Sequence, residues 1–314
     1  MKNNKLAIIA PCYNEEAIIE YSIEELLLVL NIMIDDELIS SNSKICFVND
    51  GSTDKTQEII ENHCRKNHNL TFINLSKNCG QQAAILAGLN TVDADMYVTI
   101  DADLQDNPMI IIEMVKKYFE GNKIIFGCRK KRETDSFFKK NTALMFYKFM
   151  NLIGINIRQN HSEFRLMSRL AVEKLREYKE KTLFLRGIVQ NLGLKSCDIY
   201  YDGLERRAGT TKYSPVKLIE LAWCAITSFS ILPLRIITVV GILTSLISLF
   251  IIIYALISYV KHYSIQGWTS IIMTIAFFSG IIIMSLGIIG EYLSKVLIEV
   301  KNRPLYQIEK TINL

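Results

Sequence analysis

Two long apolar runs near the end of the chain constrain its fold more than any other feature. Ile236–Val260 holds roughly 25 residues without a charge and Thr269–Gly290 about 22, and about 20 apolar helical residues span a bilayer. Only the short polar link Lys261–Trp268 separates the runs. The pattern predicts a two-helix transmembrane hairpin over residues 236–293. Buried helices of a large soluble core are the alternative, but such helices rarely run this long without a charge.

Flanking charge predicts how this hairpin is oriented. The flanks carry Arg235, Lys295, Lys301 and Arg303, and the link carries Lys261 and His262. Lysine and arginine are enriched in cytoplasmic loops, so we expect both flanks on the cytoplasmic side of the plasma membrane. A hairpin returns the chain to the side on which it entered. The N-terminal domain 1–213 and a tail over residues 294–314 are therefore both predicted in the cytoplasm.

Two further segments have the composition of interfacial helices. Residues 214–235 lead into the first apolar run and carry Lys217 and Trp223, and Phe137–Gly154 mixes lysines with Phe, Leu, Met and Tyr. Amphipathic helices of this kind lie in the head-group plane of a membrane. A surface helix that packs its apolar face on the domain is the alternative for both. The juxtamembrane position favours the interface for residues 214–235.

Composition excludes several classes of protein. The chain has seven cysteines at irregular spacings and no CxxC pair, which disfavours a zinc site and predicts reduced, structural thiols. The net charge of +4 is too small a bias to argue for a nucleic-acid partner. It suits anionic lipid head groups and phosphorylated substrates equally well.

Strand and helix patterns alternate through residues 1–130. The short apolar runs typical of buried parallel strands are Leu6–Ala10, Ile45–Asn49, Leu70–Leu75, Met96–Ile100 and Lys123–Cys128. The helical patterns between them are Ala17–Met33, Asp54–Asn67, Gln81–Thr91 and Asn107–Glu120. This alternation predicts an α/β domain with a doubly wound, mostly parallel sheet.

Polar clusters follow four of these strands. They are Pro11–Glu16, Asn49–Asp54, Asp101–Asp106 and Gly127–Arg129. Ligands of doubly wound sheets bind beyond the carboxyl ends of the strands, so the clusters predict a binding site there. The chain has no GxGxxG after its first strand and no GxxxxGK[ST], which disfavours a dinucleotide fold and removes the P-loop class. Helix caps at Asp54, Asp106 or Asn107 and a plain turn at Asp50 are the alternatives.

Asp101 and Asp103 carry the most specific chemical signal. Two carboxylates one residue apart, just beyond a strand, can point toward one position. Carboxylate oxygens suit Mg²⁺ or Mn²⁺, ions that proteins usually hold with one or two carboxylates together with substrate phosphates. The sequence therefore predicts a divalent metal site at these two residues.

The same segments resemble a known family over essentially the full length of the chain. Pro11–Glu16 matches the opening P-x-Y-N-E of family 2 glycosyltransferases, Asn49–Asp54 their D-G-S-x-D, Lys77–Ala84 their N-x-G segment, Asp101–Asp106 their D-x-D-L-Q-D, and Arg207–Tyr213 their R-x-x-G-x-S/T-K-Y loop. Within that family the chain resembles bacterial polyprenyl-phosphate glycosyltransferases of the bactoprenol glucosyltransferase type, which are related to dolichol-phosphate mannose synthase. Val300–Pro304 also ends the two-span segment as in this subgroup.

The resemblance implies a GT-A fold and a role for each matching residue. Pro11, Tyr13, Glu15 and Asp50 are expected to hold the base and ribose of a nucleotide-sugar, with Gln105, Arg206, Arg207 and Lys212 also binding substrate. Asp101 is expected to contact donor or metal and Asp103 to bind Mg²⁺ or Mn²⁺. Catalytic roles fall to Asp103, Glu163, Arg129 and Arg165.

The resemblance implies an inverting hexosyltransferase that takes its sugar from a nucleotide-sugar, UDP-glucose being favoured, and gives it to polyprenyl phosphate in cell-envelope glycan synthesis. N-acetylglucosamine, galactose, mannose or a modified arabinose stay open as the sugar. A different acceptor (a lipid, a glycan or a protein) and a non-catalytic transport or scaffold subunit are the other interpretations. The chain lacks the Q-x-x-R-W motif of processive polysaccharide synthases, which argues against a polymer synthase. A membrane hairpin also permits a homo-oligomer.

Glu163 departs from the subgroup, which often has Asp before Phe-Arg-Leu. A phosphate monoester has a second pKa of about 6, so near neutral pH the acceptor is already a nucleophile. We therefore expect Glu163 to orient Arg165 or Lys212, or to position the acceptor, without taking a proton. A surface carboxylate at the start of a strand is the alternative.

Overall fold

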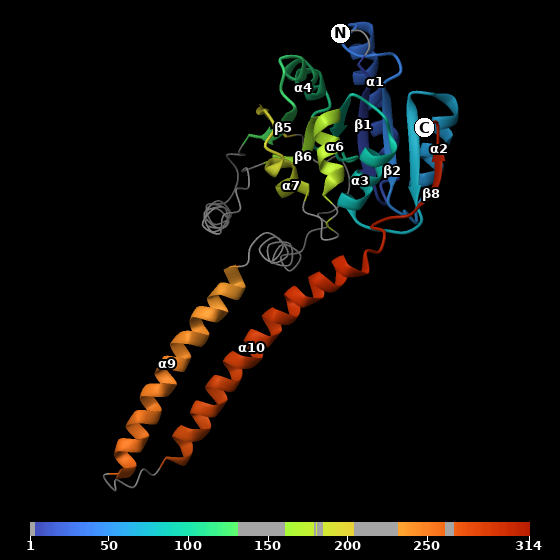
Figure 1. Cartoon of the computed structure of the whole chain (residues 1–314). Helices are drawn as coiled ribbons and strands as arrows, with labels where there is room; N and C mark the ends of the chain where they lie inside the picture. Colours follow the sequence, from blue (N-terminus) through green and yellow to red (C-terminus); the bar gives the residue numbers. More distant parts are fainter. Residues whose placement is uncertain (1–3, 131–160, 179, 181–184, 204–231, 261–266) are drawn as a thin grey trace. The chain divides into compact units, whose positions relative to one another are not determined.

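A computed structural model describes residues 4–130, 161–178, 180, 185–203, 232–260 and 267–314 (Figure 1). The chain divides into two compact units. The first comprises Met1–Asn151, Asn156–Tyr213 and the returning segment Pro304–Leu314. The second comprises Leu152–Ile155 and Ser214–Arg303.

An eight-stranded sheet forms the centre of the first unit. Its strands are β1 (Leu6–Cys12), β2 (Lys44–Asn49), β3 (Leu70–Leu75), β4 (Met96–Thr99), β5 (Ile124–Arg129), β6 (His161–Ser168), β7 (Ser196–Tyr201) and β8 (Ile308–Ile312). The order across the sheet is β7-β5-β6-β4-β1-β2-β3-β8. The pairs β4-β1, β1-β2, β2-β3 and β5-β7 are parallel, whereas β6 and β8 run antiparallel to their neighbours. The predicted α/β class with a mostly parallel sheet is confirmed.

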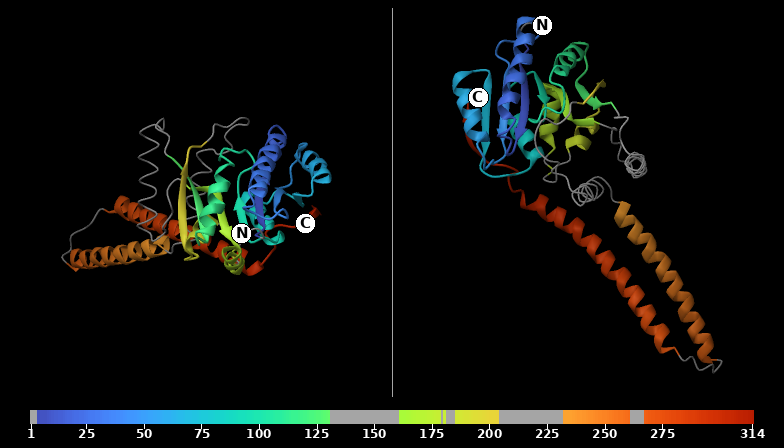
Figure 2. Two further views of the ribbon diagram at one scale, coloured as in Figure 1. Left: turned by 90° about the horizontal axis from the view of Figure 1, so that it is seen from above. Right: turned by 180° about the vertical axis from the view of Figure 1, so that it is seen from behind.

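Helices cover both faces of this sheet. They are α1 (Ile19–Asp35), α2 (Thr56–Lys66), α3 (Gln81–Thr91), α4 (Ile110–Phe119), α6 (Arg169–Glu177) and α7 (Leu185–Asn191). Figures 1 and 2 show α1 on one face and α3 and α6 on the other. On β1, Ile8 belongs to the core beneath α1, and Ile9 points the other way. On that second face, a Cβ at Gly88 of α3 would lie only 2.5 Å from Ile9 Cγ2. Glycine at this position therefore lets α3 approach the sheet closely.

Strand directions bring the polar clusters together. The parallel strands β1, β2 and β4 end at the same edge of the sheet, which is where their clusters begin. Strand β6 runs the opposite way, with Thr99 paired to Arg165. Continuing this register by two residues sets Glu163 opposite Asp101. An antiparallel strand thus brings its first residues to the edge at which the parallel strands finish.

The C-terminal segment corrects the prediction of a tail over residues 294–314. Helix α10 of the second unit continues to Lys301, and β8 then pairs antiparallel with β3 as the last strand of the sheet. The Ser76 N–H donates to the Gln307 carbonyl (3.0 Å), and Asn313 Nδ2 donates to the carbonyls of Cys64 (2.6 Å) and Leu70 (3.1 Å). A five-residue strand, isolated from the others by the apolar runs, gives too short a pattern to be recognised.

Two long helices make up the described part of the second unit. They are α9 (Leu232–Val260) and α10 (Trp268–Lys301), and they cover both apolar runs (Figure 1). By length and composition, one described stretch, Phe277–Lys301, is apolar enough to cross a membrane. Its apolar side chains are largely exposed, for example Ile283 at 70% and Leu293 at 65%. The predicted interfacial segment 137–154 lies outside the described residues, as do residues 214–231 of the predicted segment 214–235; its last residues begin α9.

Candidate active site

Asp50 ties the loop after β2 to the loop before α3. Its two carboxylate oxygens accept hydrogen bonds from the backbone N–H groups of Cys79 (2.7 Å) and Gly80 (2.9 Å). Burial raises the pKa of Asp50, and these two N–H donors partly oppose the rise. Gly51 has φ of +68°, and a Cβ there would lie 2.6 Å from the Asn78 nitrogen. The Asp50-Gly51 turn is therefore present. The Asp50 carboxylate also holds the loop before α3 in place.

Backbone N–H groups of the loop after β1 bond to side chains of the segment that follows β2. The Asn14 N–H donates to Ser52 Oγ (2.9 Å), and the Glu15 N–H donates to Thr56 Oγ1 (2.9 Å). Asp54 accepts from the N–H groups of both Thr56 (3.0 Å) and Glu16 (3.1 Å), so it acts as a helix-start acceptor and as a loop connector. The two segments therefore form one structure.

The residues predicted to bind the donor lie on this structure at different depths. Pro11 is buried at the end of β1, Glu15 is partly buried, and Tyr13 is 36% exposed. Asp50 is 3% exposed. Tyr13 and Glu15 are therefore the members of this group that solvent can reach.

Asp101 and Asp103 lie in one turn beyond β4. The Leu104 N–H donates to the Asp101 carbonyl (3.1 Å), and Leu104 adopts φ of +46°. Gln81 Nε2 donates to Asp101 Oδ1 (2.6 Å), and Gln105 Nε2 donates to Asp103 Oδ2 (2.7 Å). Neutral amides thus hold both carboxylates in place.

Burial, together with the negative charges of Asp106, Asp103 and Glu163, raises the pKa of Asp101 to about 7. Such a concentration of hard oxygen donors fits Mg²⁺ or Mn²⁺. Within the described residues no group of three acidic, histidine or cysteine side chains could hold a metal by itself. Phosphate oxygens of a substrate would therefore be needed to complete the coordination of a cation.

Arg129 is positioned by an acidic partner that the sequence suggested as a helix cap. Its Nε lies 2.6 Å from Asp106 Oδ1, to which the Tyr201 hydroxyl also donates (2.6 Å). Burial lowers the pKa of Arg129, but the bond to Asp106 more than reverses this and keeps the guanidinium charged. Asn107 is the helix-start acceptor, since its Oδ1 receives the Met109 N–H (3.0 Å). The cap interpretation is therefore wrong for Asp106.

Glu163 occupies a buried ionic cluster and is not a surface carboxylate. It is 3% exposed in β6 and pairs with Arg165 on one oxygen and with Arg186 Nε on the other (2.8 Å). Arg165 is 1% exposed, and among the described residues its Nε has no hydrogen-bond partner. Because Arg165 is buried and bonds to Glu163, we expect it to position that carboxylate. No sequence motif indicated Arg186, which lies on helix α7, after β6 in the chain.

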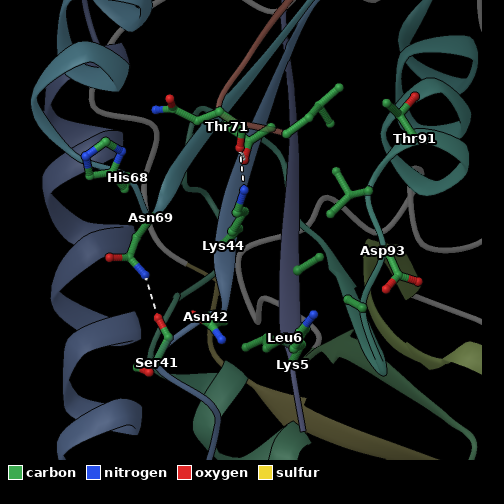
Figure 3. A pocket seen from close by; sticks show the side chains of 15 residues that line it. Lys5, Leu6, Ser41, Asn42, Lys44, His68, Asn69, Thr71, Thr91 and Asp93 are labelled. Carbon is green, nitrogen blue, oxygen red and sulfur yellow. Dashed lines mark hydrogen bonds between the residues drawn. The ribbon is translucent and has the colours of Figure 1, made fainter.

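Some predicted residues lie outside the described residues, namely Arg206, Arg207 and Lys212. Their roles stay predictions. A pocket of about 610 Å³ is lined instead by Lys5, Lys44, His68 and Asp93 among others (Figure 3). Lys5 and Lys44 lie at the amino ends of β1 and β2, and none of the predicted site residues lines this pocket. The candidate active site therefore lies at the opposite end of the parallel strands, beyond their carboxyl ends.

Replacing Asp101 with Asn is expected to stabilise the metal-free protein, and more at pH 8 than at pH 5. Because folding raises this pKa, the ionised carboxylate costs stability. The cost is absent below the ordinary pKa near 4, grows with pH, and is complete above about 7. The rise from 3.8 to about 7 corresponds to at most about 4 kcal/mol. Denaturant unfolding in EDTA at both pH values measures the gain.

Asp93→Asn is the matched control for this prediction. Arg169 lies 2.7 Å from Asp93 and lowers the pKa of that carboxyl, so this substitution should give no gain in stability. A gain for Asp101→Asn that is equal at pH 5 and pH 8 would contradict the assigned cause.

Comparison with known proteins assigns the family. The sequence model of glycosyl transferase family 2 matches residues 7–176. The uncharacterized glycosyltransferase YkoT of Bacillus subtilis is 42% identical, covering 97% of this chain and 91% of its own. The SfII prophage-derived bactoprenol glucosyl transferase of Shigella flexneri is 34% identical, covering 98% of both chains.

Solved structures resemble the chain more distantly. Glucosyl-3-phosphoglycerate synthase of Mycobacterium tuberculosis, solved with Mn²⁺ and UDP, has a TM-score of 0.48 at 17% identity and covers 71% of this chain and 77% of its own. Mannosyl-3-phosphoglycerate synthase of Rubrobacter xylanophilus has a TM-score of 0.49 at 14% identity, covering 71% and 72%. The family match and the full-length relatives carry the conclusion: this chain belongs to glycosyl transferase family 2 and is a glycosyltransferase.

Proposed function

We propose that the enzyme transfers a hexose from a nucleotide-sugar to a polyprenyl phosphate with inversion at the anomeric carbon. The observation that carries this is the meeting of Asp101, Asp103 and Glu163 beside the donor loops at one edge of the sheet. Relatives named bactoprenol glucosyl transferase, 33–34% identical over 97–98% of the chain, support the acceptor class. They also make UDP-glucose the first donor to test.

The donor roles follow from the loop geometry. Tyr13 and Glu15, on the loop after β1, contact the base and ribose, and Pro11 shapes the end of the strand. Asp50, which is buried, holds the adjoining loops in the shape that receives the nucleoside. Asp103 and Asp101 would hold Mg²⁺ or Mn²⁺, which would neutralise charge on the departing nucleoside diphosphate. Gln105 donates to Asp103 and accepts from Arg129. The charge of Arg129 faces a substrate phosphate.

The acceptor roles follow from the charge of a phosphate. A phosphate monoester that is mostly a dianion at pH 7 already has a nucleophilic oxygen, so the protein needs chiefly to align two anions. Glu163 takes no proton in this scheme. It holds Arg186 near the reacting groups. The basic residues Arg206, Arg207 and Lys212 close over the donor diphosphate and the acceptor phosphate.

The acceptor and the apolar helices imply a membrane enzyme. We propose that α9 and α10 cross the plasma membrane as a hairpin, with the sheet on the cytoplasmic side. The apolar side chains of Phe277–Lys301 are exposed, and residues 236–260 carry no charge. Because β7 and β8 belong to one sheet, the chain between them must cross a membrane an even number of times. Labelling of a Ser264→Cys variant from outside intact cells tests this, and no labelling would contradict it.

Transfer by membranes that contain the enzyme tests the proposed function. Undecaprenyl phosphate is offered with labelled UDP-glucose, UDP-N-acetylglucosamine, UDP-galactose and a mannose donor. We expect one donor to yield a labelled lipid that mild acid hydrolyses, in the β configuration from an α-linked donor. Label that appears in diacylglycerol, glycan or protein, and not in the polyprenyl lipid, would overturn the acceptor assignment.

A further inference from the structure

A line of hydrogen-bonded side chains joins the C-terminal strand β8 to the donor loops. Glu309 Oε2 accepts a hydrogen bond from Asn74 Nδ2 (2.8 Å), and Asn74 Oδ1 accepts one from Asn49 Nδ2 (2.7 Å). Asn49 Oδ1 accepts from the N–H and the hydroxyl of Ser52, at 3.3 and 2.5 Å. Ser52 Oγ accepts from the Asn14 N–H (2.9 Å). The line thus runs from β8 through β3 and β2 to the loop after β1.

The acceptor at its outer end favours one orientation of the two amide side chains in this line. An ionised carboxylate can only accept, so Glu309 requires the amide nitrogen of Asn74 to face it. The Asn74 oxygen must then face Asn49, which presents its own oxygen to Ser52. The Ser52 hydroxyl donates to Asn49, and Ser52 Oγ accepts the Asn14 N–H. A donor at position 309 would reverse both amides and set an amide NH₂ against the Ser52 N–H.

A bulge in the edge strand brings Glu309 to Asn74. Lys310 is paired with Asn74 across the ladder and Ile308 with Leu75, which leaves Glu309 as the extra residue between them. In a regular strand Glu309 would point to the opposite face from the Asn74 side chain. Bulges redirect side chains in this way. Lys310 is held separately, with its Nζ 2.7 Å from Glu61 Oε2 of α2.

Burial makes the amides of this line dependent on one another. Asn49 is fully buried and Asn74 is 4% exposed, whereas Glu309 is exposed on the edge strand. A buried amide that loses its partner cannot replace it with bulk water. A change at the exposed end is therefore passed inward, because each amide can recover its bonds only by turning and disturbing the next.

We propose that Glu309 is a positioning residue for the donor site and that it fixes the orientation of Asn74 and Asn49. The loop of residues 49–54 then keeps the shape in which Ser52 holds the loop after β1. This inference rests on the proposed role of these loops in donor binding. Strand β8, which follows α10, thus supports the nucleotide site. It also pairs with β3, which would otherwise be the edge strand of the sheet.

Amide hydrogen exchange of the full-length protein without ligand tests the line independently of activity. Glu309→Lys presents a donor and should speed exchange at the Ser52 amide by about tenfold, because its acceptor Asn49 Oδ1 turns away. Exchange at the Asn14 amide should also rise, because Ser52 is then displaced. Glu309→Gln can still accept from Asn74 and should restore exchange to within about twofold. Lys310→Gln, the neighbouring change on the same strand, removes the Glu61 pair and should leave these amides unchanged. Unchanged exchange in Glu309→Lys, or equal acceleration in Lys310→Gln, overturns the proposal.

Equilibrium binding of UDP with Mg²⁺ then tests the link to the donor. Glu309→Lys should raise the Kd for UDP about tenfold, equivalent to about 1.4 kcal/mol, and raise KM for the donor more than it lowers kcat. Simple charge attraction predicts the opposite, because the substitution adds positive charge for a diphosphate. Faster exchange with an unchanged or lower Kd overturns the positioning role. If the unaltered protein binds no UDP, the proposed donor is wrong, and the exchange experiment still decides on the line itself.

Discussion

Replacing Asp103 with Asn is expected to remove nearly all sugar transfer while the protein stays folded. The carboxylate is partly exposed in the turn after β4 and is held by Gln105, which can also bond to an Asn side chain. An amide carries no charge and binds a divalent cation weakly, so we expect kcat to fall by at least about 10³-fold, or about 4 kcal/mol of transition-state stabilisation. Initial rates of lipid-linked sugar formation measure the loss.

EDTA and a matched substitution complete this test. EDTA should reduce the unaltered enzyme to the level of Asp103→Asn, and added Mg²⁺ or Mn²⁺ should restore only the unaltered enzyme. Asp93→Asn is the same chemical change at the amino edge of the sheet, where the exposed pair with Arg169 contributes little. Its rate should stay within about twofold of normal. Full turnover in EDTA would refute the metal assignment.

The sequence predicted the parallel part of the sheet because buried parallel strands are continuous apolar runs. Each of the five predicted strands is present with its ends within two residues, and the helices between them follow in the predicted order. The clusters after β1, β2 and β4 could also be foreseen, since the carboxyl ends of parallel strands share one edge. This much depends on local pattern and one topological rule.

The remaining features depend on contacts between distant parts of the chain. Glu163 and Arg165 are charged, so their strand lacks an apolar pattern, and their burial makes sense only with Arg186 beside them. Asp106 has the sequence context of a helix cap, and only the fold brings Arg129 to it. Likewise, nothing near Glu309 indicates Asn74, which lies far back along the chain on a strand of the same sheet.

Glu163→Gln is expected to lower stability strongly and activity only in part. Glu163 supplies the negative charge between Arg165 and Arg186, and breaking a buried ion pair by removing one partner costs about 3–5 kcal/mol. Gln keeps the shape and one acceptor, so we expect a loss of about 2–3 kcal/mol in the free energy of unfolding. Transfer should persist at roughly a tenth to a hundredth of the normal rate, since misplacement of nearby groups slows the reaction without removing the nucleophile.

The pH dependence separates this role from that of a general base. If the acceptor phosphate is its own nucleophile, kcat/KM of Glu163→Gln should still rise near pH 6, as the phosphate loses its second proton. A variant that keeps normal binding of both substrates, yet is as inactive as Asp103→Asn, would identify Glu163 as the base and refute the mechanism.

A double substitution decides whether the stability loss comes from charge. Arg186→Gln removes one of the two cations that Glu163 balances, so Glu163→Gln should cost less when Arg186 is already Gln. We expect the double variant to be more stable than the sum of the two single losses predicts, by about 1–2 kcal/mol. Activity need not recover with it, because Arg186 also lowers the pKa of Asp101, and its loss removes positive charge where two anions must meet. Stability that is additive across the cycle would mean that Glu163 and Arg186 are not coupled, and that Arg165 alone is the partner of the buried carboxylate.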